Sequence, residues 1–328
     1  MPMSPQELKQ HLKGVIHLVM TPFMDADDLD EEALRVGVRH AVNALKGEDA
    51  VFLATGSTAE FYAMTEEENA RAIQIIVAEV SGEFPVIAGT GRAGTKLTVK
   101  ASQQAQELGA DGVMVVPPYY NPVTKDGIYR HFKTVAENID LGIVVYNNPL
   151  ACRLWIPPDL MVRLSKIDKV VGDKENTANA LKYYGMQRTV DPDDMVILCG
   201  IGQPMYVFEA VFRCPGFVTE FVNFAPEIAI DLYKAAQQRD FDRVTQIMEK
   251  MAPYFQFLAK LARRRSTVPT ILSPYLASPE LTLYQSVIKS AMEIVGLPGG
   301  KVREPMENLT DEDKEELRDV LKQMGSVS

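Results

Sequence analysis

The chain repeats a pair of segments, in which a short apolar run is followed by an amphipathic stretch of helical length. The apolar runs are rich in Val and Ile, which is typical of strands that are buried on both faces. They are Gly14–Met20, Ala50–Thr55, Phe84–Ala88, Gly112–Val116, Leu141–Tyr146, Lys169–Val171, Met195–Cys199 and Gly216–Val218. The helical segments between and after them are Glu31–Leu45, Thr65–Val80, Thr95–Leu108, Lys125–Glu137, Pro158–Leu164, Asn176–Tyr184, Pro204–Phe212 and Pro226–Gln237.

This alternation predicts an α/β protein with a parallel sheet. Eight units, repeating at roughly thirty residues, favour closure into a (β/α)8 TIM barrel, with an open doubly wound sheet as the alternative. After about residue 238 the strands stop, and helices are expected at Asp240–Leu261, Leu281–Val295 and Asp311–Gln323. We therefore predict a barrel with a short N-terminal helix in residues 1–238 and a C-terminal helical subdomain in residues 239–328.

Composition narrows the class of protein. With 46% hydrophobic and 24% charged residues, the chain can bury a large core. The net charge of −10 argues against nucleic-acid binding, which needs basic patches. No apolar stretch is long enough to span a bilayer, and the N-terminus has no signal-peptide pattern, so a cytoplasmic protein is expected. The three cysteines and four histidines show no metal-ligand spacing, so we expect no metal.

Candidate chemistry gathers where strands end, because barrel enzymes carry their active sites at the carboxyl ends of the strands. Polar or aromatic residues follow strands two, four, five, six and seven, at Gly56–Phe61, Pro117–Pro122, Tyr146–Pro149, Gly172–Asn176 and Gly200–Gly202. Taken alone, each has an ordinary explanation: a solvated lysine, a half-buried tyrosine, a turn or a packing contact. Their joint placement on one rim favours a functional site.

Lys174 is the candidate nucleophile of this rim. A lysine at the end of a buried strand can lose its charge, and the neutral amine attacks ketones. The resulting iminium is an electron sink that permits cleavage of a carbon–carbon bond or loss of a β-leaving group. Tyr146 could relay protons. The hydroxyl and N–H groups of Ser57 and Thr58 could hold a carboxylate.

A glycine pattern after strand three, Gly89–Gly94, matches the dinucleotide fingerprint G-x-G-x-x-G. A nicotinamide site would also need an acidic residue about twenty positions later, at the end of the next strand. That strand ends in Val115, Val116 and Pro117. The oxidoreductase interpretation is therefore disfavoured, and the glycines are expected to allow tight turns.

Four motifs now resemble one family over nearly the whole chain: Gly56–Glu60, Pro118–Tyr120, Tyr146–Pro149 and Gly172–Glu175. The chain is similar to the dihydrodipicolinate synthase and N-acetylneuraminate lyase family of class I aldolases. The resemblance implies a Schiff base with a 2-oxo acid at Lys174 and proton relay by Tyr146. It also implies that Tyr120 joins the relay across a dimer interface.

The same resemblance implies further binding roles and an assembly. The carboxylate would be held by Ser57, Thr58 and the backbone around Ala59. The backbone carbonyl near Val218 would face the lysine. Family members are commonly homotetramers, built as dimers of dimers, so a dimer or tetramer is expected here. Their catalysis uses no metal and no cofactor beyond the lysine.

Departures from the family pattern concern the substrate. Ala59 replaces the loop glycine and adds a methyl group where the carboxylate would approach. Ala151 stands where dihydrodipicolinate synthases usually carry an arginine, and this disfavours lysine biosynthesis. Residues 59–65 and 222–227 resemble the 5-dehydro-4-deoxyglucarate dehydratase branch. The strand-five Asn-Pro, followed by Arg153, resembles hydratase-aldolases for aryl-substituted pyruvates. The candidate specificity residues are Arg153, Asn148, Gly200 and Gly202.

These observations predict a Schiff-base-forming lyase, either an aldolase or a dehydratase, that acts on pyruvate or a 2-oxo-3-deoxy acid. Two alternatives stay open. One is a hydratase-aldolase for aryl-substituted pyruvates. The other is a non-catalytic family member that serves as a sensor or interaction protein, which Ala59 and the missing arginine would suit.

Overall fold

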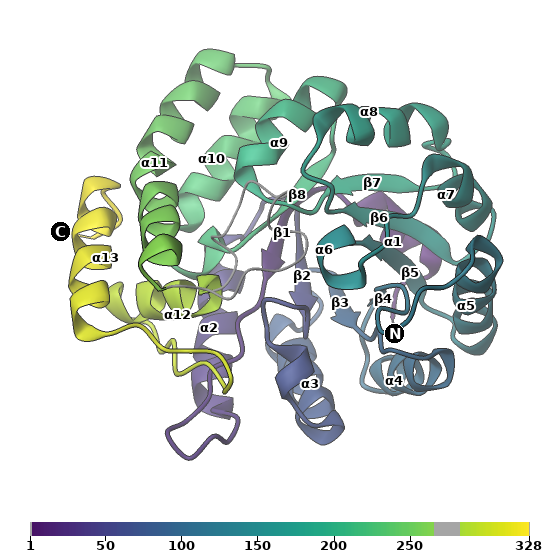
Figure 1. The fold of residues 1–328 in the computed structure, drawn as a ribbon, viewed down its shortest axis with the longest axis horizontal. Helices are drawn as coiled ribbons and strands as arrows, with labels where there is room; N and C mark the ends of the chain where they lie inside the picture. Colours follow the sequence, from purple (N-terminus) through teal and green to yellow (C-terminus); the bar gives the residue numbers. More distant parts are fainter. Residues whose placement is uncertain (1, 266–282, 328) are drawn as a thin grey trace.

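The computed structural model describes residues 2–265 and 283–327 and contains a closed barrel of parallel strands (Figure 1). The strands pair in sequence order, and β8 closes the barrel on β1, where Gly216 is opposite Gly14. They are β1 (Gly14–Leu18), β2 (Ala50–Ala54), β3 (Val86–Gly89), β4 (Gly112–Val115), β5 (Gly142–Asn147), β6 (Val170–Glu175), β7 (Val196–Cys199) and β8 (Gly216–Thr219). The predicted TIM barrel is confirmed, and the alternative of an open sheet is wrong.

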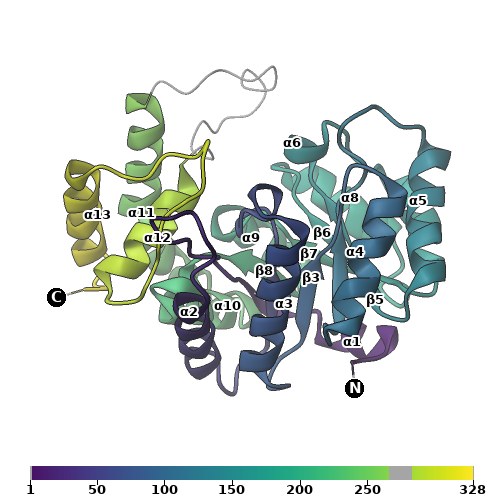
Figure 2. The ribbon, with the colours of Figure 1, turned by 90° about the horizontal axis from the view of Figure 1, so that it is seen from below.

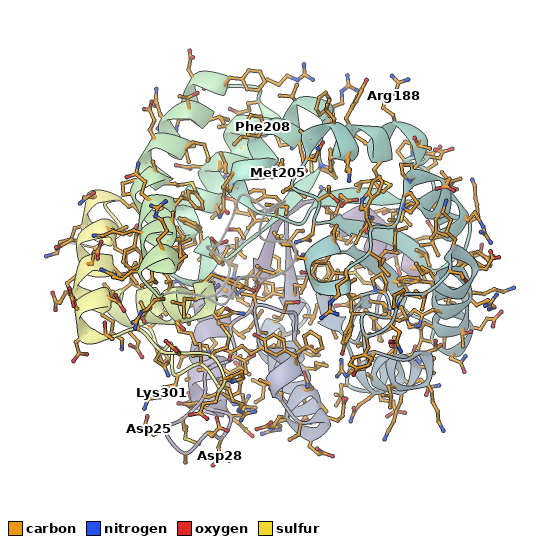
Figure 3. All side chains as sticks on the ribbon, viewed as in Figure 1. Asp25, Asp28, Arg188, Met205, Phe208 and Lys301 are labelled. Carbon is orange, nitrogen blue, oxygen red and sulfur yellow. The ribbon has the colours of Figure 1, made fainter. Side chains whose placement is uncertain are left out.

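Helices surround the barrel as a ring (Figure 1). Those that follow the strands are α2 (Glu31–Ala44), α3 (Glu66–Val80), α4 (Thr95–Glu107), α5 (Lys125–Asn138), α7 (Pro158–Ser165), α8 (Ala180–Thr189), α9 (Gln203–Glu209) and α10 (Pro226–Gln237). Short 3-10 turns lie at Phe61–Ala63, Ala210–Phe212 and Phe221–Asn223, and a one-turn helix, α6, at Pro149–Cys152. Figure 3 labels Arg188 on α8 and Met205 and Phe208 on α9; Phe208 is exposed, whereas Met205 packs against the core.

Two boundaries around Lys174 differ from the prediction. Strand β6 continues to Glu175 rather than ending at Val171, and α8 begins at Ala180 rather than Asn176. The charged residues 173–175 indicated a loop, but in the structure they are buried within the strand. Asn179 then caps α8 by accepting a hydrogen bond from the N–H of Lys182.

A second short helix, α1 (Pro5–His11), closes the amino-terminal end of the barrel. Leu8 of α1 belongs to the apolar cluster that fills the barrel interior. Glycines at the start of β4 and β5 make room for it, since a Cβ on Gly112 or Gly142 would lie 2.4 or 2.8 Å from the Leu8 side chain. The barrel is thus plugged at this end, which leaves the opposite rim for chemistry.

The C-terminal helices are α11 (Phe241–Arg264), α12 (Tyr284–Ile294) and α13 (Asp311–Gln323). They lie together on one side of the barrel, next to α2 and α10 (Figure 2). The helix predicted at Leu281–Val295 corresponds to α12, and its first two residues lie outside the described residues. Among the described helices, none is long and apolar enough to cross a membrane.

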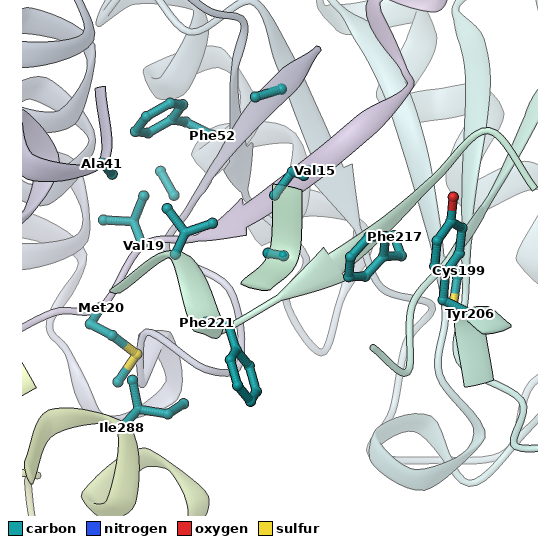
Figure 4. Packing of buried hydrophobic residues seen from close by; sticks show 14 of the residues in the cluster. Val15, Val19, Met20, Ala41, Phe52, Cys199, Tyr206, Phe217, Phe221 and Ile288 are labelled. Carbon is teal, nitrogen blue, oxygen red and sulfur yellow. The ribbon is translucent and has the colours of Figure 1, made fainter. Parts of the chain in front are cut away.

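One apolar cluster joins the barrel to these helices. It fills the layer between the strands and the surrounding helices and continues into α11, α12 and α13. Figure 4 shows Met20, which follows β1, beside Ile288 of α12. The C-terminal helices are therefore part of the packing that surrounds the barrel, and their positions are coupled to it.

Candidate active site

Lys174 lies inside strand β6 and points into the barrel. Its strand partners are Tyr146 on β5 and Leu198 on β7, and both belong to the interior cluster. The side chain is buried, with 4% of its surface exposed. The solvated-loop interpretation of Lys174 is therefore excluded by its position.

Two neighbours contact the amine of Lys174. The amine donates a hydrogen bond to Oδ1 of Asn176 at 2.9 Å and lies 3.7 Å from the centroid of the Tyr146 ring. Burial lowers the pKa of Lys174, while the interaction with Tyr146 opposes this effect. The net shift of the pKa is downward, so the neutral, nucleophilic amine is easier to reach than in a solvated lysine.

Tyr146 is held in place by Asn148. The side-chain amide of Asn148 donates to the Tyr146 hydroxyl at 2.8 Å. The amide oxygen of Asn148 accepts from the N–H groups of Leu150 and Ala151, at 3.1 and 3.3 Å, and so caps α6. Asn148, which was predicted to affect specificity, therefore orients the hydroxyl of the candidate proton relay.

The loop after β2 has the form expected of a carboxylate site. The N–H of Ala59 bonds to the carbonyl of Gly56 at 3.1 Å and closes a turn. Within the described residues, the N–H groups of Ser57 and Thr58 have no hydrogen-bond partner, so both can donate to an anion. The Thr58 hydroxyl lies 3.3 Å from that of Tyr284 on α12.

An open cavity of about 250 Å³ lies at this rim. It includes the loop at Ser57 and the ring of Tyr146 but not Lys174, so Tyr146 is the residue that connects the cavity with the amine. Its wall is mainly apolar and is formed by Thr55, Gly56, Ser57, Phe61, Tyr62, Gly89, Gly91, Met114, Val116, Tyr119, Tyr146 and Ala151.

Tyr120 and Arg153 do not line the cavity. Tyr120 is 77% exposed, whereas its neighbour Tyr119 forms part of the wall. A role for Tyr120 across a subunit interface requires a second chain and stays a prediction. Arg153 ends α6 in a left-handed conformation and is exposed, while Ala151 faces the cavity.

The three remaining predicted residues lie around the end of β7 and β8. A Cβ on Gly200 would stand 1.9 Å from Oδ1 of Asn176, the atom that accepts from Lys174. Gly202 has φ +103°, and a Cβ there would lie 3.6 Å from the carbonyl oxygen of Val218. Gly200 thus makes room for the Lys174 acceptor, and Val218 is buried in the barrel interior.

Three buried carboxyl groups behind β6 are a feature that the sequence analysis missed. Asp173 and Glu175 alternate with Lys174 and point to the outer layer, where Glu209 of α9 also lies. Burial raises the pKa of Asp173 and raises that of Glu209 to about 8. The carboxylate of Glu175 accepts a hydrogen bond from the side-chain amide of Asn147 at 2.9 Å. The alternation of acidic and basic residues at positions 173–175, directly after an apolar run, was the signal in the sequence that could have indicated these buried carboxyl groups.

Asn176, which accepts the hydrogen bond from Lys174, was also missed, although it directly follows the lysine motif.

No group of three or more His, Cys, Asp or Glu residues in the described part of the chain is arranged to hold a metal ion. The arrangement is a buried lysine, an oriented tyrosine and a loop with two N–H groups available to an anion, beside a cavity. Such an arrangement can bind a carboxylate next to a nucleophilic amine.

Comparisons with known proteins identify the family of this chain. The model of the dihydrodipicolinate synthetase family matches residues 11–324. A 4-hydroxy-tetrahydrodipicolinate synthase from Methanopyrus kandleri is 30% identical over 96% of this chain and 97% of its own length. The chain therefore belongs to the dihydrodipicolinate synthetase family. It is an enzyme, a lyase of the class I aldolase type.

Solved structures share the fold across the same length. The dihydrodipicolinate synthase from Bacillus clausii superposes with a TM-score of 0.83, at 25% identity, and covers 97% of this chain and 99% of its own. YagE, a prophage protein of the family from E. coli K12 solved in complex with pyruvate, gives a TM-score of 0.83 at 25% identity, covering 96% and 99%.

The contact between Gly200 and Asn176 makes the first testable prediction. Gly200→Ala should lower the free energy of unfolding by about 1–3 kcal/mol, because the new methyl group displaces the Asn176 side chain. Asn176→Ala in the same chain should restore part of this loss. Gly185→Ala is the control, since a Cβ at Gly185, in the middle of α8, meets nothing within 4 Å. Denaturant unfolding that gives Gly200→Ala the stability of the unaltered protein would contradict the packing.

Proposed function

We propose that this protein is a Schiff-base-forming lyase that acts on a 2-oxo acid through Lys174. The observation that carries the proposal is the buried Lys174 amine against the Tyr146 ring, with its pKa lowered by burial. A solvated lysine would be protonated at neutral pH and could not attack a ketone. Binding of pyruvate by the related YagE supports a 2-oxo acid as the substrate class.

The reaction begins with the carboxylate of the substrate on the N–H groups of Ser57 and Thr58. This places the 2-oxo carbonyl toward Tyr146 and Lys174, and the neutral amine adds to the carbonyl carbon. The Tyr146 hydroxyl, oriented by Asn148, delivers the proton that turns the carbinolamine hydroxyl into departing water. The product of this step is an iminium on Lys174.

The iminium then accepts electrons from the bond that breaks. In an aldolase this bond is C3–C4, and an aldehyde leaves with an enamine on the lysine. In a dehydratase it is the C3–H bond: C3 loses its proton, and the resulting enamine expels the hydroxyl on C4 as water, which leaves an unsaturated iminium. The aldolase enamine is then protonated, and in both cases hydrolysis of the iminium returns Lys174 and releases the 2-oxo product. Either course uses Lys174 and Tyr146 as catalytic residues, so product analysis separates the two reactions.

Borohydride trapping tests the proposal. Incubation with pyruvate and borohydride should add ~72 Da to Lys174, which is pyruvate less one water plus two hydrogens. Peptide mass spectrometry locates the adduct. Lys174→Met, of similar volume, should fold and form no adduct. Absence of an adduct on Lys174 with every 2-oxo acid tried would refute the proposal and favour the non-catalytic alternative.

The cavity favours an apolar, aryl-bearing partner over a polar sugar acid. Phe61, Tyr62, Met114 and Tyr119 supply aromatic and apolar surface. Ala151 faces this surface at the position where an arginine would bind an anionic group. This supports the alternative of a hydratase-aldolase for aryl-substituted pyruvates.

A pair of substitutions at Ala151 tests this second candidate. Ala151→Arg should lower kcat/KM for an aryl aldehyde with pyruvate by about tenfold, because a cation enters an apolar wall. Ala151→Leu, which adds bulk without charge, separates steric from electrostatic effects. Competition between benzaldehyde and glyceraldehyde as acceptors measures the preference. A wild-type preference for glyceraldehyde would exclude the aryl specificity.

A further inference from the structure

The C-terminal helices directly contact the carboxylate loop, which is the loop after β2 that contains Ser57 and Thr58. The residues of the loop after β2 that they contact are Thr58, Glu60 and Tyr62. All three partners lie on α12: Tyr284 contacts Thr58, Lys289 contacts Glu60 and Gln285 contacts Tyr62. One helix from the end of the chain thus contacts alternate residues of the loop that is proposed to bind the substrate.

Glu60 is the central residue of this contact. It has φ +59°, a left-handed conformation that a non-glycine residue keeps only when its surroundings hold it there. Its carboxylate is fully buried and accepts from the amine of Lys289 at 2.6 Å and from the N–H of Arg303 at 2.9 Å. The conformation of the loop therefore depends on two groups from the C-terminal part.

Lys289 is itself held on several sides. It is buried, donates to the carbonyl of Lys301 at 2.6 Å and lies 4.5 Å from the centroid of the Phe23 ring. Burial lowers its pKa and the interaction with Glu60 opposes this shift; the net result is a pKa of about 8, so the protonated amine is favoured at neutral pH. The ion pair with Glu60 is thus a buried, geometrically defined contact rather than a surface pair.

Arg303 extends the contact to the start of α3. Its guanidinium forms two hydrogen bonds of 2.8 Å to Glu68, which caps α3, and one of 2.9 Å to the carbonyl of Ala63. Nearby, Lys301 pairs with Asp25 at 2.7 Å, and Figure 3 shows these two residues side by side. The loop at 58–68 is therefore fixed at several points along its length.

We infer that Lys289, Arg303 and Tyr284 are positioning residues for the carboxylate site. They hold Glu60 and Thr58, and so fix the directions of the Ser57 and Thr58 N–H groups. This inference rests on the proposed function, since it assigns these N–H groups to the substrate carboxylate. A purely structural ion pair would stabilise the fold without a selective effect on substrate binding.

The test removes the charges of the pair while keeping its volume. Glu60→Gln/Lys289→Met should fold, because replacing both partners of a buried ion pair is far less costly than removing one. Borohydride trapping across a range of pyruvate concentrations gives a half-saturation concentration and a maximal rate. We expect the half-saturation concentration to rise about tenfold, with the maximal rate within about threefold, since Lys174 and Tyr146 are untouched.

Tyr284→Phe is the second variant and removes only the hydroxyl that contacts Thr58. It should raise the half-saturation concentration by about threefold. Lys314→Met is the control: it breaks the 2.9 Å ion pair between α13 and Glu293 of α12, away from the loop, and should change neither parameter.

The outcomes separate the two levels of the proposal. No trapping in the unaltered protein refutes the proposed function itself. Normal trapping in the unaltered protein, with an unchanged half-saturation concentration in both Glu60→Gln/Lys289→Met and Tyr284→Phe, refutes the positioning role alone. A fall of the maximal rate without a change in half-saturation also refutes it. If the double variant does not fold, Tyr284→Phe decides.

Discussion

The site depends on the burial of one lysine inside a barrel strand. Lys174 is taken out of water by the interior cluster, and its amine contacts Asn176 and Tyr146. Desolvation of an ammonium group is costly, so the neutral amine is favoured relative to the charged form. The rest of the rim follows from this constraint: Gly200 leaves space for the acceptor, and Asn148 fixes the tyrosine.

The surroundings of this lysine are organised from two directions. On the outer side of β6, the carboxyl groups of Asp173 and Glu209 are buried, and burial raises the pKa of each, which favours their neutral forms. On the cavity side, the loop after β2, which is proposed to bind the carboxylate, is held through Glu60 by groups more than two hundred residues later in the chain. The C-terminal helices are thus connected to the site by polar contacts as well as by the shared apolar cluster.

Most of the architecture could be predicted because strand burial leaves a clear apolar pattern. The barrel, its order and the rim motifs follow from that pattern. The apolar pattern did not predict the full length of β6, because Asp173, Lys174 and Glu175 are charged yet buried. A pattern of hydrophobicity alone assigns such residues to a loop, because the partners that allow their burial lie on other strands and helices.

The site could be predicted only in part, for a related reason. Lys174, Tyr146, Ser57 and Thr58 lie in motifs, whereas the pairing of Glu60 with Lys289 joins residues 229 positions apart. No local pattern reports a contact of that range. The choice of Tyr119 over Tyr120 as a cavity residue likewise depends on the path of the chain after β4, which leaves Tyr120 exposed.

The pH dependence of iminium formation tests the central claim most directly. Below its pKa, Lys174 is protonated and cannot attack, so the rate at saturating pyruvate should rise with pH and level off above the pKa. Because burial lowers that pKa, the midpoint should lie clearly below 10.5, the ordinary value for lysine. A rate that climbs without levelling until pH 10.5, or an adduct on another lysine, would contradict the account.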